Sequence, residues 1–308
     1  MEEKVLKARD VYLKTMKFVW LKLALGSAIF LFALLTMFLF WWLGSLGGGN
    51  GIVMALTIWL ILVCAVYGIV QRYVGYMIKA GHVAMVTTAV TTGTLPENQF
   101  EAAKSMVKER FLTSNVYFAV DRLVSGAVSQ LQKGLQKVED LLGKIPGVSF
   151  LVSFAQVFVH IALNYIDECC LGYTFLHREQ SAFKSAADGV VIYFQNWKTL
   201  LKNAAVTTLI VMGVSLLAWL LPFLIFVGIF ALLHIHWIFA FVLALMVAAV
   251  IKSAFVDSYM MVKMMVSYMQ VAPTTEITFD LYDKLCKLSG KFKSLFDKGQ
   301  QEQQQYGR

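Results

Sequence analysis

Polar side chains that could do chemistry inside a membrane cluster shortly after the middle of the chain. His160, Asn164 and Asp167 recur at positions i, i+4 and i+7, so they share one face of a helix. Gln156 extends that face upstream, while Glu168 points about 100° away from Asp167. Acids beside an apolar helix are unfavourable unless they are paired or hydrated. These residues therefore indicate a candidate site that binds a cation, relays protons or gates a passage.

A structural interpretation stands beside the chemical one. Asp167 and Glu168 could lie at the aqueous interface in ion pairs with Arg178 or Lys184, because such surface pairs are common. Asp257 is a second candidate for ion coupling. It lies close in sequence to Lys residues that can extend to the interface, so it could simply lie outside the hydrocarbon. We favour the structural interpretation at both places.

The remaining polar residues do not form a recognisable catalytic or metal site. His234 and His236 are a short His-x-His pair without further ligands nearby in sequence. The dinucleotide G-x-G-x-x-G, P-loop, H-E-x-x-H, G-x-S-x-G and C-x-x-C patterns are absent. The neighbours Cys169 and Cys170 could be acylated, although packing is the simpler interpretation. We expect no enzyme, no catalytic residue, no metal and no cofactor.

The elements that position these residues are unusually apolar. Hydrophobic residues make up 58% of the 308 positions and charged residues 15%, whereas soluble domains are about half apolar and about a quarter charged. No Lys, Arg, Asp or Glu occurs in 23–71 or 203–251, each 49 residues long. A bilayer core needs roughly 20 helical residues, so each block predicts two spans and a turn. The predicted class is an all-α integral membrane protein with four transmembrane helices as two hairpins, plus amphipathic and re-entrant or interfacial cytoplasmic helices.

Basic residues predict the sidedness of the hairpins. Lys and Arg number 5 in residues 1–17, 9 in 71–147, 4 in 177–203 and 6 in 264–308, and the two hairpin turns hold none. The positive-inside rule therefore places the turns outside and both termini of this multi-pass chain in the cytoplasm. This bias and contact with anionic lipid explain the net charge of +8, so nucleic acid is not an expected partner.

The segment 148–175 could change this topology, because 145–166 has no formal charge over 22 residues and is long enough to span. Both flanks are rich in Lys and Arg, and a single crossing would place one of them outside. A lipid-exposed helix would not carry the polar face described above. We therefore expect a helix that dips in and returns, or lies along the interface, in preference to a fifth span.

Six consecutive parts follow from these patterns. They are an amphipathic cytoplasmic N-terminus (1–17), transmembrane hairpin 1 (18–80), a cytoplasmic or interfacial helical region (81–203), transmembrane hairpin 2 (204–270), an amphipathic C-terminal helix (271–298) and a disordered tail (299–308). Helical stripes of apolar residues run through 116–142 and through the C-terminal helix, where they are Leu281, Leu285, Leu288, Phe292 and Leu295. Lysines surround the second stripe, so that helix either packs on the protein or is held on anionic lipid.

The two charge-free blocks suggest an internal repeat. They begin 180 positions apart, and each follows a basic lead-in. Each block ends in a basic residue, Arg72 or Lys252, and we expect its second helix to continue past that residue. Because both hairpins have the same predicted orientation, the repeat would be parallel rather than inverted.

Two short motifs flank the second block. Ser185-Ala186-Ala187-Asp188-Gly189, followed at a distance by Gln195-Asn196 and a span, resembles the segment before the penultimate span of the choline transporter-like family. Val256-Asp257-Ser258 is similar to that family's Val-Asp-Thr motif. The resemblance covers about 185–260 and implies a transporter-like core for choline, ethanolamine or a similar amine. Members of the family are about twice as long, with some ten spans, and no binding role carries over to Ser185, Asp188 or Asn196.

Two functions remain open from the sequence. The polar face and the resemblance predict a transport-type or permease-like protein for a small cation or amine. The amphipathic segments indicate instead a non-catalytic membrane scaffold or a lipid-interacting protein. The expected partners are the lipid bilayer, anionic lipid in particular, and further copies of the chain.

Overall fold

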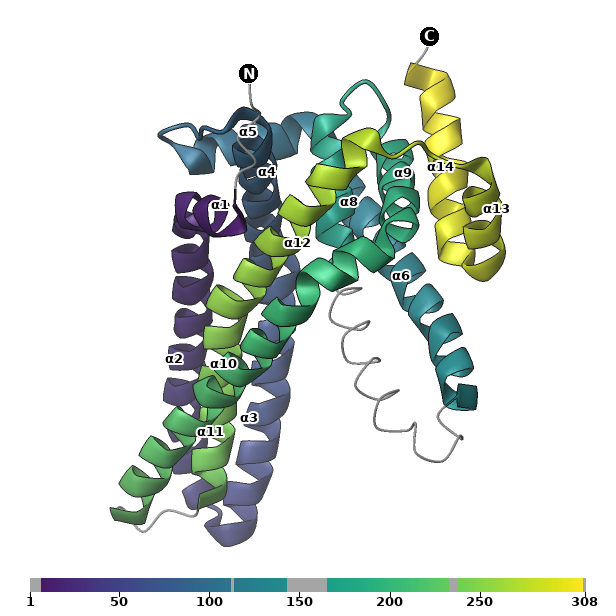
Figure 1. Cartoon of the computed structure of the whole chain (residues 1–308). Helices are drawn as coiled ribbons and strands as arrows, with labels where there is room; N and C mark the ends of the chain where they lie inside the picture. The colour runs from purple at the N-terminus through teal and green to yellow at the C-terminus, as the bar shows by residue number, and fades with distance from the viewer. Residues whose placement is uncertain (1–6, 112–113, 143–164, 233–236, 307–308) are drawn as a thin grey trace. The chain divides into compact units, whose positions relative to one another are not determined.

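The computed structural model describes residues 7–111, 114–142, 165–232 and 237–306, and within these ranges the chain forms helices and no strand (Figure 1). The chain divides into two compact units. Unit 1 comprises Met1–Thr15, Ala80–Val211 and Tyr259–Arg308, and unit 2 comprises Met16–Lys79 and Met212–Ser258. Three helices contribute residues to both units: α4 (Tyr76–Thr92), α10 (Trp197–Leu232) and α12 (Asp257–Val271).

Unit 2 contains most of the apolar helical surface. Besides parts of the shared helices it holds α2 (Met16–Ser45), α3 (Gly48–Val70), α11 (Trp237–Ile251) and two π-helical segments, η1 (Gln71–Gly75) and η2 (Lys252–Val256). Four helical stretches of the described chain are long and apolar enough to cross a membrane: Met16–Ser45, Gly48–Thr92, Leu209–Ile229 and Ala240–Thr274. The expected all-helical class with four candidate spans is therefore confirmed.

Glycines allow the first hairpin to close tightly. α2 and α3 lie side by side (Figure 1). A Cβ on Gly51 would lie 2.5 Å from the carbonyl oxygen of Gly44, and a Cβ on Gly44 would lie 2.8 Å from the Cα of Ile52. Gly48 begins α3 with a φ of +69°, a conformation that side chains disfavour. Larger residues at these positions would push the two helices apart.

Unit 1 is built around α9 (Ala182–Gln195). Its other helices are α1 (Ala8–Lys14), α5 (Gln99–Phe111), α6 (Ser114–Leu142), α8 (Ile166–Leu176), η3 (Ala272–Thr274), α13 (Phe279–Leu288) and α14 (Gly290–Tyr306). α6, α8, α13 and α14 all contact α9. A Cβ on Gly189 would lie 3.1 Å from the Cα of Cys170, so glycine lets α9 and α8 approach at backbone distance. Nearly every residue of α9 is consequently buried.

The C-terminal segment differs from the expected single helix and disordered tail. Ser289 divides it, because its hydroxyl accepts a hydrogen bond from the Phe292 backbone N–H at 3.0 Å and so caps the start of α14. α14 then remains helical to Tyr306. Its backbone packs on α9 at Gly299, and the Gln303 side chain accepts a hydrogen bond of 2.9 Å from the Ser181 N–H. The expectation of disorder is therefore wrong for 299–306, where tertiary contacts order a polar sequence.

The apolar stripe of the C-terminal helices packs on the protein. Leu285, Phe292 and Leu295 are buried in unit 1, whereas Leu288 remains 67% exposed. The surrounding lysines are exposed: Lys284, Lys287, Lys291, Lys293 and Lys298. Of the two sequence-based alternatives, packing on the protein therefore accounts for the stripe, and contact with anionic lipid remains a prediction for the lysines alone.

Residues 148–164 of the expected non-crossing helix 148–175 lie outside the described residues. The described remainder belongs to α8, which begins at Ile166 and packs within unit 1. Whether the chain crosses a membrane here stays a prediction.

Equivalent helix boundaries recur at an almost constant spacing in the two halves of the chain. α9 ends 181 positions after α1, and α10 begins 181 positions after α2. η1 and η2 have equal length and the same spacing of 181 at both ends. α13 begins 180 positions after α5. The expected continuation of each second helix past Arg72 or Lys252 is confirmed, and both continuations pass through a π-helical segment.

Candidate functional site

Asp167, the acid of the predicted polar face, and its neighbour Glu168 lie in the first turn of α8. Glu168 is buried, and Asp167 is half-buried and accepts a hydrogen bond of 3.5 Å from the Ser125 hydroxyl. Carboxylates are stabilised at this end of a helix by its free N–H groups and dipole. His160 and Asn164, with which Asp167 was expected to share a face, lie outside the described residues.

The expected ion partners of these acids bind other carboxylates. Arg178 pairs with Glu109 at 3.3 Å, and Lys184 pairs with Asp188 one helical turn away. The prediction that Arg178 or Lys184 pairs with Asp167 or Glu168 is therefore wrong. Sequence proximity suggested those pairs, but the packing of α5 and α9 supplies nearer partners.

Asp257 is held by a local ion pair. Its Oδ1 lies 2.6 Å from the Nζ of Lys252, and both side chains are at least one-third exposed. This geometry favours the structural interpretation over ion coupling.

Asp188, the carboxylate of the α9 motif at 185–196, is almost fully buried, with 1% of its surface exposed. It accepts hydrogen bonds from the Lys184 ammonium and from the Tyr282 hydroxyl of α13. Burial raises the pKa of Asp188, and the hydrogen bond and charge of Lys184 partly offset this rise. The group thus ties α13 to α9 through a closed polar network.

Ser185, the first residue of the motif, belongs to a second buried network that sequence reasoning missed. Its hydroxyl donates to the His177 carbonyl oxygen at 3.1 Å and accepts from Arg110 Nη2 at 3.0 Å. The Arg110 guanidinium also donates to the carbonyl oxygens of Gln180 at 2.9 Å and His177 at 3.2 Å. Arg110 therefore clamps the turn between α8 and α9 onto α5.

Asn196, the last residue of the motif, caps the C-terminus of α9 and marks one of two equivalent junctions. Its amide donates to the Ile192 carbonyl at 3.0 Å and to the Thr275 hydroxyl at 2.8 Å. Thr15, which is 181 positions earlier and caps the C-terminus of α1, likewise hydrogen-bonds back to the Val11 carbonyl at 3.0 Å. It also lies 3.1 Å from His82 Nε2.

The last residues of α1 and α9, Lys14 and Gln195, each donate a hydrogen bond to a loop, and the two loops occupy equivalent places in the two halves of the chain. Lys14 donates to the carbonyl oxygen of Gly93 at 2.6 Å, just after α4. Gln195 donates to the carbonyl oxygen of Glu276 at 2.9 Å, just after α12 and η3. The two halves of the chain therefore share side-chain interactions as well as helix boundaries.

Both vicinal cysteines are core residues. Cys169 and Cys170 have no exposed surface, and burial raises the pKa of each thiol well above its ordinary value. A protonated, enclosed thiol is a poor nucleophile. The packing interpretation is therefore confirmed over acylation.

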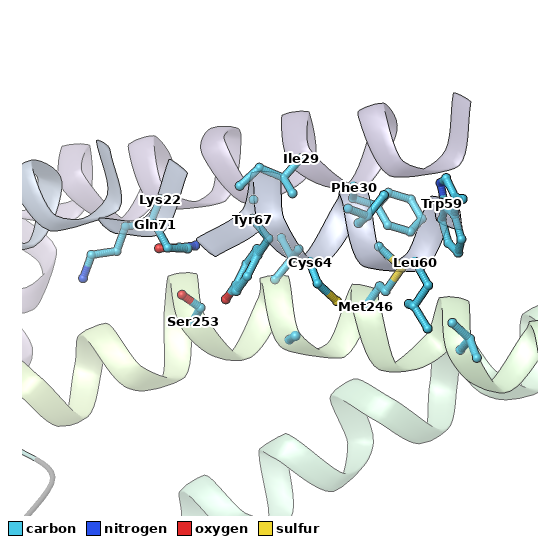
Figure 2. Close-up of a pocket in the computed structure, with 15 residues that line it drawn as sticks. Lys22, Ile29, Phe30, Trp59, Leu60, Cys64, Tyr67, Gln71, Met246 and Ser253 are labelled. Atoms are coloured by element: carbon cyan, nitrogen blue, oxygen red, sulfur yellow. The ribbon is translucent and has the colours of Figure 1, made fainter. Parts of the chain in front are cut away.

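A pocket in unit 2 is the clearest candidate for binding a ligand. It has a volume of about 260 Å³ and lies between α2, α3 and α11, with residues of η1 and η2 in its lining. Figure 2 shows Lys22 and Gln71 toward one end, Tyr67 and Ser253 next to them, and Trp59 at the opposite end. The Trp59 indole N–H donates to the Ala33 carbonyl at 3.2 Å, so its polar atom is already satisfied.

The rest of the pocket lining is apolar and comes from helices distant in sequence. It includes Ile29, Phe30, Leu60, Met246 and Val250. None of these residues was singled out by sequence reasoning, because an apolar residue in a candidate span carries no distinguishing pattern. Lys22 is the one available signal, since it is a basic residue just before a charge-free block.

The described residues contain no group of three His, Cys, Asp or Glu side chains placed to hold a metal ion. His234 and His236 lie outside them. Two features of the described residues are chemically relevant. Unit 2 has an apolar pocket with a polar end, which suits non-covalent binding of a ligand, and unit 1 has buried hydrogen-bonded networks that join its helices.

Comparisons with protein-family models, curated proteins and solved structures gave no significant match. The resemblance to the choline transporter-like family therefore stays a prediction that rests on the motifs around α9 and α12.

Proposed function

We propose that this chain is a multi-pass membrane protein whose unit 2 binds a lipid-like amphiphile between α2, α3 and α11. The pocket in unit 2 is the observation that carries the proposal. Ligand pockets are typically concave and mostly apolar, with a few convergent polar groups that orient the ligand. An elongated apolar lining with Lys22, Gln71 and Ser253 at one end matches a molecule that has a hydrocarbon chain and a polar head.

The outer surfaces of the helices that form the pocket support a lipid-facing location. Leu35 of α2 and Ile61 of α3 are 70% and 64% exposed. Such side chains in water would make an apolar patch far larger than soluble proteins tolerate. A hydrocarbon chain would reach the pocket directly from a surrounding bilayer.

The test uses a neutral photoreactive probe, so that binding depends on the hydrocarbon part of the probe and not on its charge. Protein in nanodiscs is irradiated with a diazirine-bearing long-chain alcohol, and the labelled peptides are located by mass spectrometry. We expect labels concentrated on α2, α3 and α11. Ala249→Phe, at an exposed residue that lines the pocket, should sharply reduce labelling. Ala65→Phe, at an exposed neighbour outside the lining, should not. Uniform labelling of all apolar helices, unaffected by either change, would refute the proposal.

Transport of a small cation or amine is a second candidate, favoured by the repeated architecture. Many transporters consist of two repeats with broken helices near the substrate site. Here the helix boundaries recur at a spacing of 181, and η1 and η2 interrupt equivalent helices. π-Helical segments inside α-helices are often functional. This repeat supports the transport hypothesis without indicating a substrate.

Radiolabelled choline uptake into proteoliposomes tests this second candidate. Asp167→Asn is the informative variant, because Asp167 is the described acid of the predicted polar face. The hypothesis expects uptake by the wild type and reduced uptake by the variant. Uptake no faster than in protein-free vesicles would count against choline transport.

A further inference from the structure

One face of α3 and η1 forms a wall of the pocket in unit 2. Leu60, Cys64, Tyr67 and Gln71 line the pocket at spacings of 4, 3 and 4, as residues on one helical face do. This face is apolar at Leu60 and ends in the hydroxyl of Tyr67 and the amide of Gln71. Ser253 of η2 adds a second hydroxyl from the other half of the chain. Figure 2 shows these three polar side chains toward the same end of the pocket.

The charge of Lys22 is not directed at this polar end. Figure 2 shows its ammonium group pointing away from the other lining residues, and its Nζ lies 2.9 Å from Ser258 Oγ. Every other described residue that lines the pocket is uncharged. A charged head group between apolar walls is unfavourable unless an opposite charge faces it. The pocket therefore disfavours both anionic and cationic head groups.

The three polar side chains suit a ligand that both donates and accepts hydrogen bonds. Tyrosine and serine hydroxyls do both, and the glutamine amide donates through its nitrogen and accepts through its oxygen. Hydroxyl groups on a ligand have the same two capacities, whereas a carboxylate only accepts and a trimethylammonium group does neither. Gln71, Tyr67 and Ser253 therefore match hydroxyl groups better than they match an ionised head.

We infer that the pocket takes an uncharged lipid whose head carries hydroxyl groups, held by Gln71, Tyr67 and Ser253, with its hydrocarbon part directed toward Trp59. The volume of about 260 Å³ lies just below the roughly 300–1,000 Å³ of pockets that enclose drug-sized molecules, so it suits a small head and one hydrocarbon chain or ring system. This inference rests on the proposed function and adds the charge and the head-group chemistry of the ligand.

Fluorescence quenching measures this binding, because Trp59 lines the far end of the pocket. Purified protein in a neutral detergent at about pH 9, where a free carboxyl is ionised, is titrated with lipids that share one dibrominated eighteen-carbon chain. Bromine atoms quench nearby indoles. The chain is presented as a glycerol monoester, a methyl ester, a free acid and a trimethylammonium. The difference between the wild type and Trp59→Phe isolates the signal of this tryptophan.

The glycerol ester should bind most tightly, by about fivefold over the methyl ester for each hydrogen bond that its hydroxyls make. The acid and the ammonium should bind more weakly than the glycerol ester. Tyr67→Phe and Ser253→Ala should each reduce the preference for the glycerol ester over the methyl ester about fivefold. Tyr73→Phe, at an exposed tyrosine of η1 outside the lining, should leave that preference intact.

Competition then identifies the source of the hydroxyl. Displacement of the glycerol ester by an unbrominated sterol, and not by an unbrominated single-chain alcohol, supports the inference and assigns the head to a sterol. The reverse result supports it equally and assigns the head to a single-chain lipid.

Three results would contradict the inference. Equal quenching of Trp59 by the glycerol ester and the methyl ester would overturn the role of the hydroxyls and leave amphiphile binding in place. Tightest binding of the acid or of the ammonium would overturn the assignment of an uncharged ligand. No quenching by any of the four lipids would overturn both this inference and the proposed function. If a variant does not fold, the order of the four lipids on the wild type still decides the question.

Discussion

Gly299 offers a sharp test of the packing that orders the C-terminal helix. A Cβ at this position would lie 2.8 Å from both the Cα and the backbone N of Lys184. Carbon atoms in favourable contact are about 3.5–4.0 Å apart, so Gly299→Leu would force α14 away from α9 by roughly 0.7 Å or more. Overpacking of this kind typically costs about 1–3 kcal/mol. The higher helix propensity of Leu offsets only about 1 kcal/mol of that cost in α14 itself.

The movement would also strain contacts that depend on close approach of α14 to α9. One of them is the hydrogen bond of 2.9 Å from the Ser181 N–H to the Gln303 side chain. We therefore expect a net loss of about 2 kcal/mol in the stability of the docked α14, toward the upper part of the overpacking range.

Hydrogen–deuterium exchange in detergent measures this local stability. A loss of about 2 kcal/mol should accelerate exchange of the α14 amides about thirtyfold, because every 1.4 kcal/mol is a factor of ten. Gly290→Leu is the matched control, since no atom lies within 4 Å of a Cβ built at Gly290. Similar exchange in both variants would refute the close packing of α14 on α9. Rapid exchange of the α14 amides in the wild type would instead support the original expectation that the tail is disordered.

The remaining predictions concern the buried groups of unit 1. Arg110→Lys should lower stability by about 2 kcal/mol in a denaturant titration, because a lysine cannot reproduce the guanidinium fork that holds the α8–α9 turn; an unchanged midpoint would contradict the clamp. Because burial raises the pKa of Asp188, its stabilising contribution is present at low pH and is lost as pH rises through that raised pKa. The thermal midpoint of the wild type should accordingly fall relative to that of Asp188→Asn between about pH 4 and 7, and the opposite slope would show that Lys184 outweighs burial. A maleimide should not label Cys169 or Cys170 in the folded protein and should label both after unfolding; native labelling of the pair would show that α8 is not a closed core helix.

The C-terminal tail illustrates why composition misled one expectation. The sequence from Gly299 onward is polar and rich in Gln, and composition alone predicts disorder for such a segment. Its helix forms because Gly299 fits against α9 and Gln303 meets a backbone N–H from another helix. Neither contact can be predicted from the spacing of apolar residues within the segment.

Polar contacts between residues far apart in the chain could not be predicted from the sequence either. Asp188 and Tyr282 are 94 positions apart, and Arg110 and Ser185 are 75 apart. The α9 motif was noticed for its resemblance to a family, yet the structure gives Ser185 and Asp188 the role of joining helices. The pocket of unit 2 was also missed, because its lining comes from α2, α3 and α11, whose residues look alike in sequence.

By itself, the sequence determined the helical class, the four apolar stretches and the continuation of two helices past Arg72 and Lys252. Those features depend on charge and hydropathy within a segment, which the order of residues states directly. Only the tertiary structure decided which carboxylates pair with Lys184 and Arg178, where the C-terminal stripe is buried, and which apolar residues surround a pocket. Those outcomes depend on which helices become neighbours, and that choice is made by close packing between segments far apart in the chain.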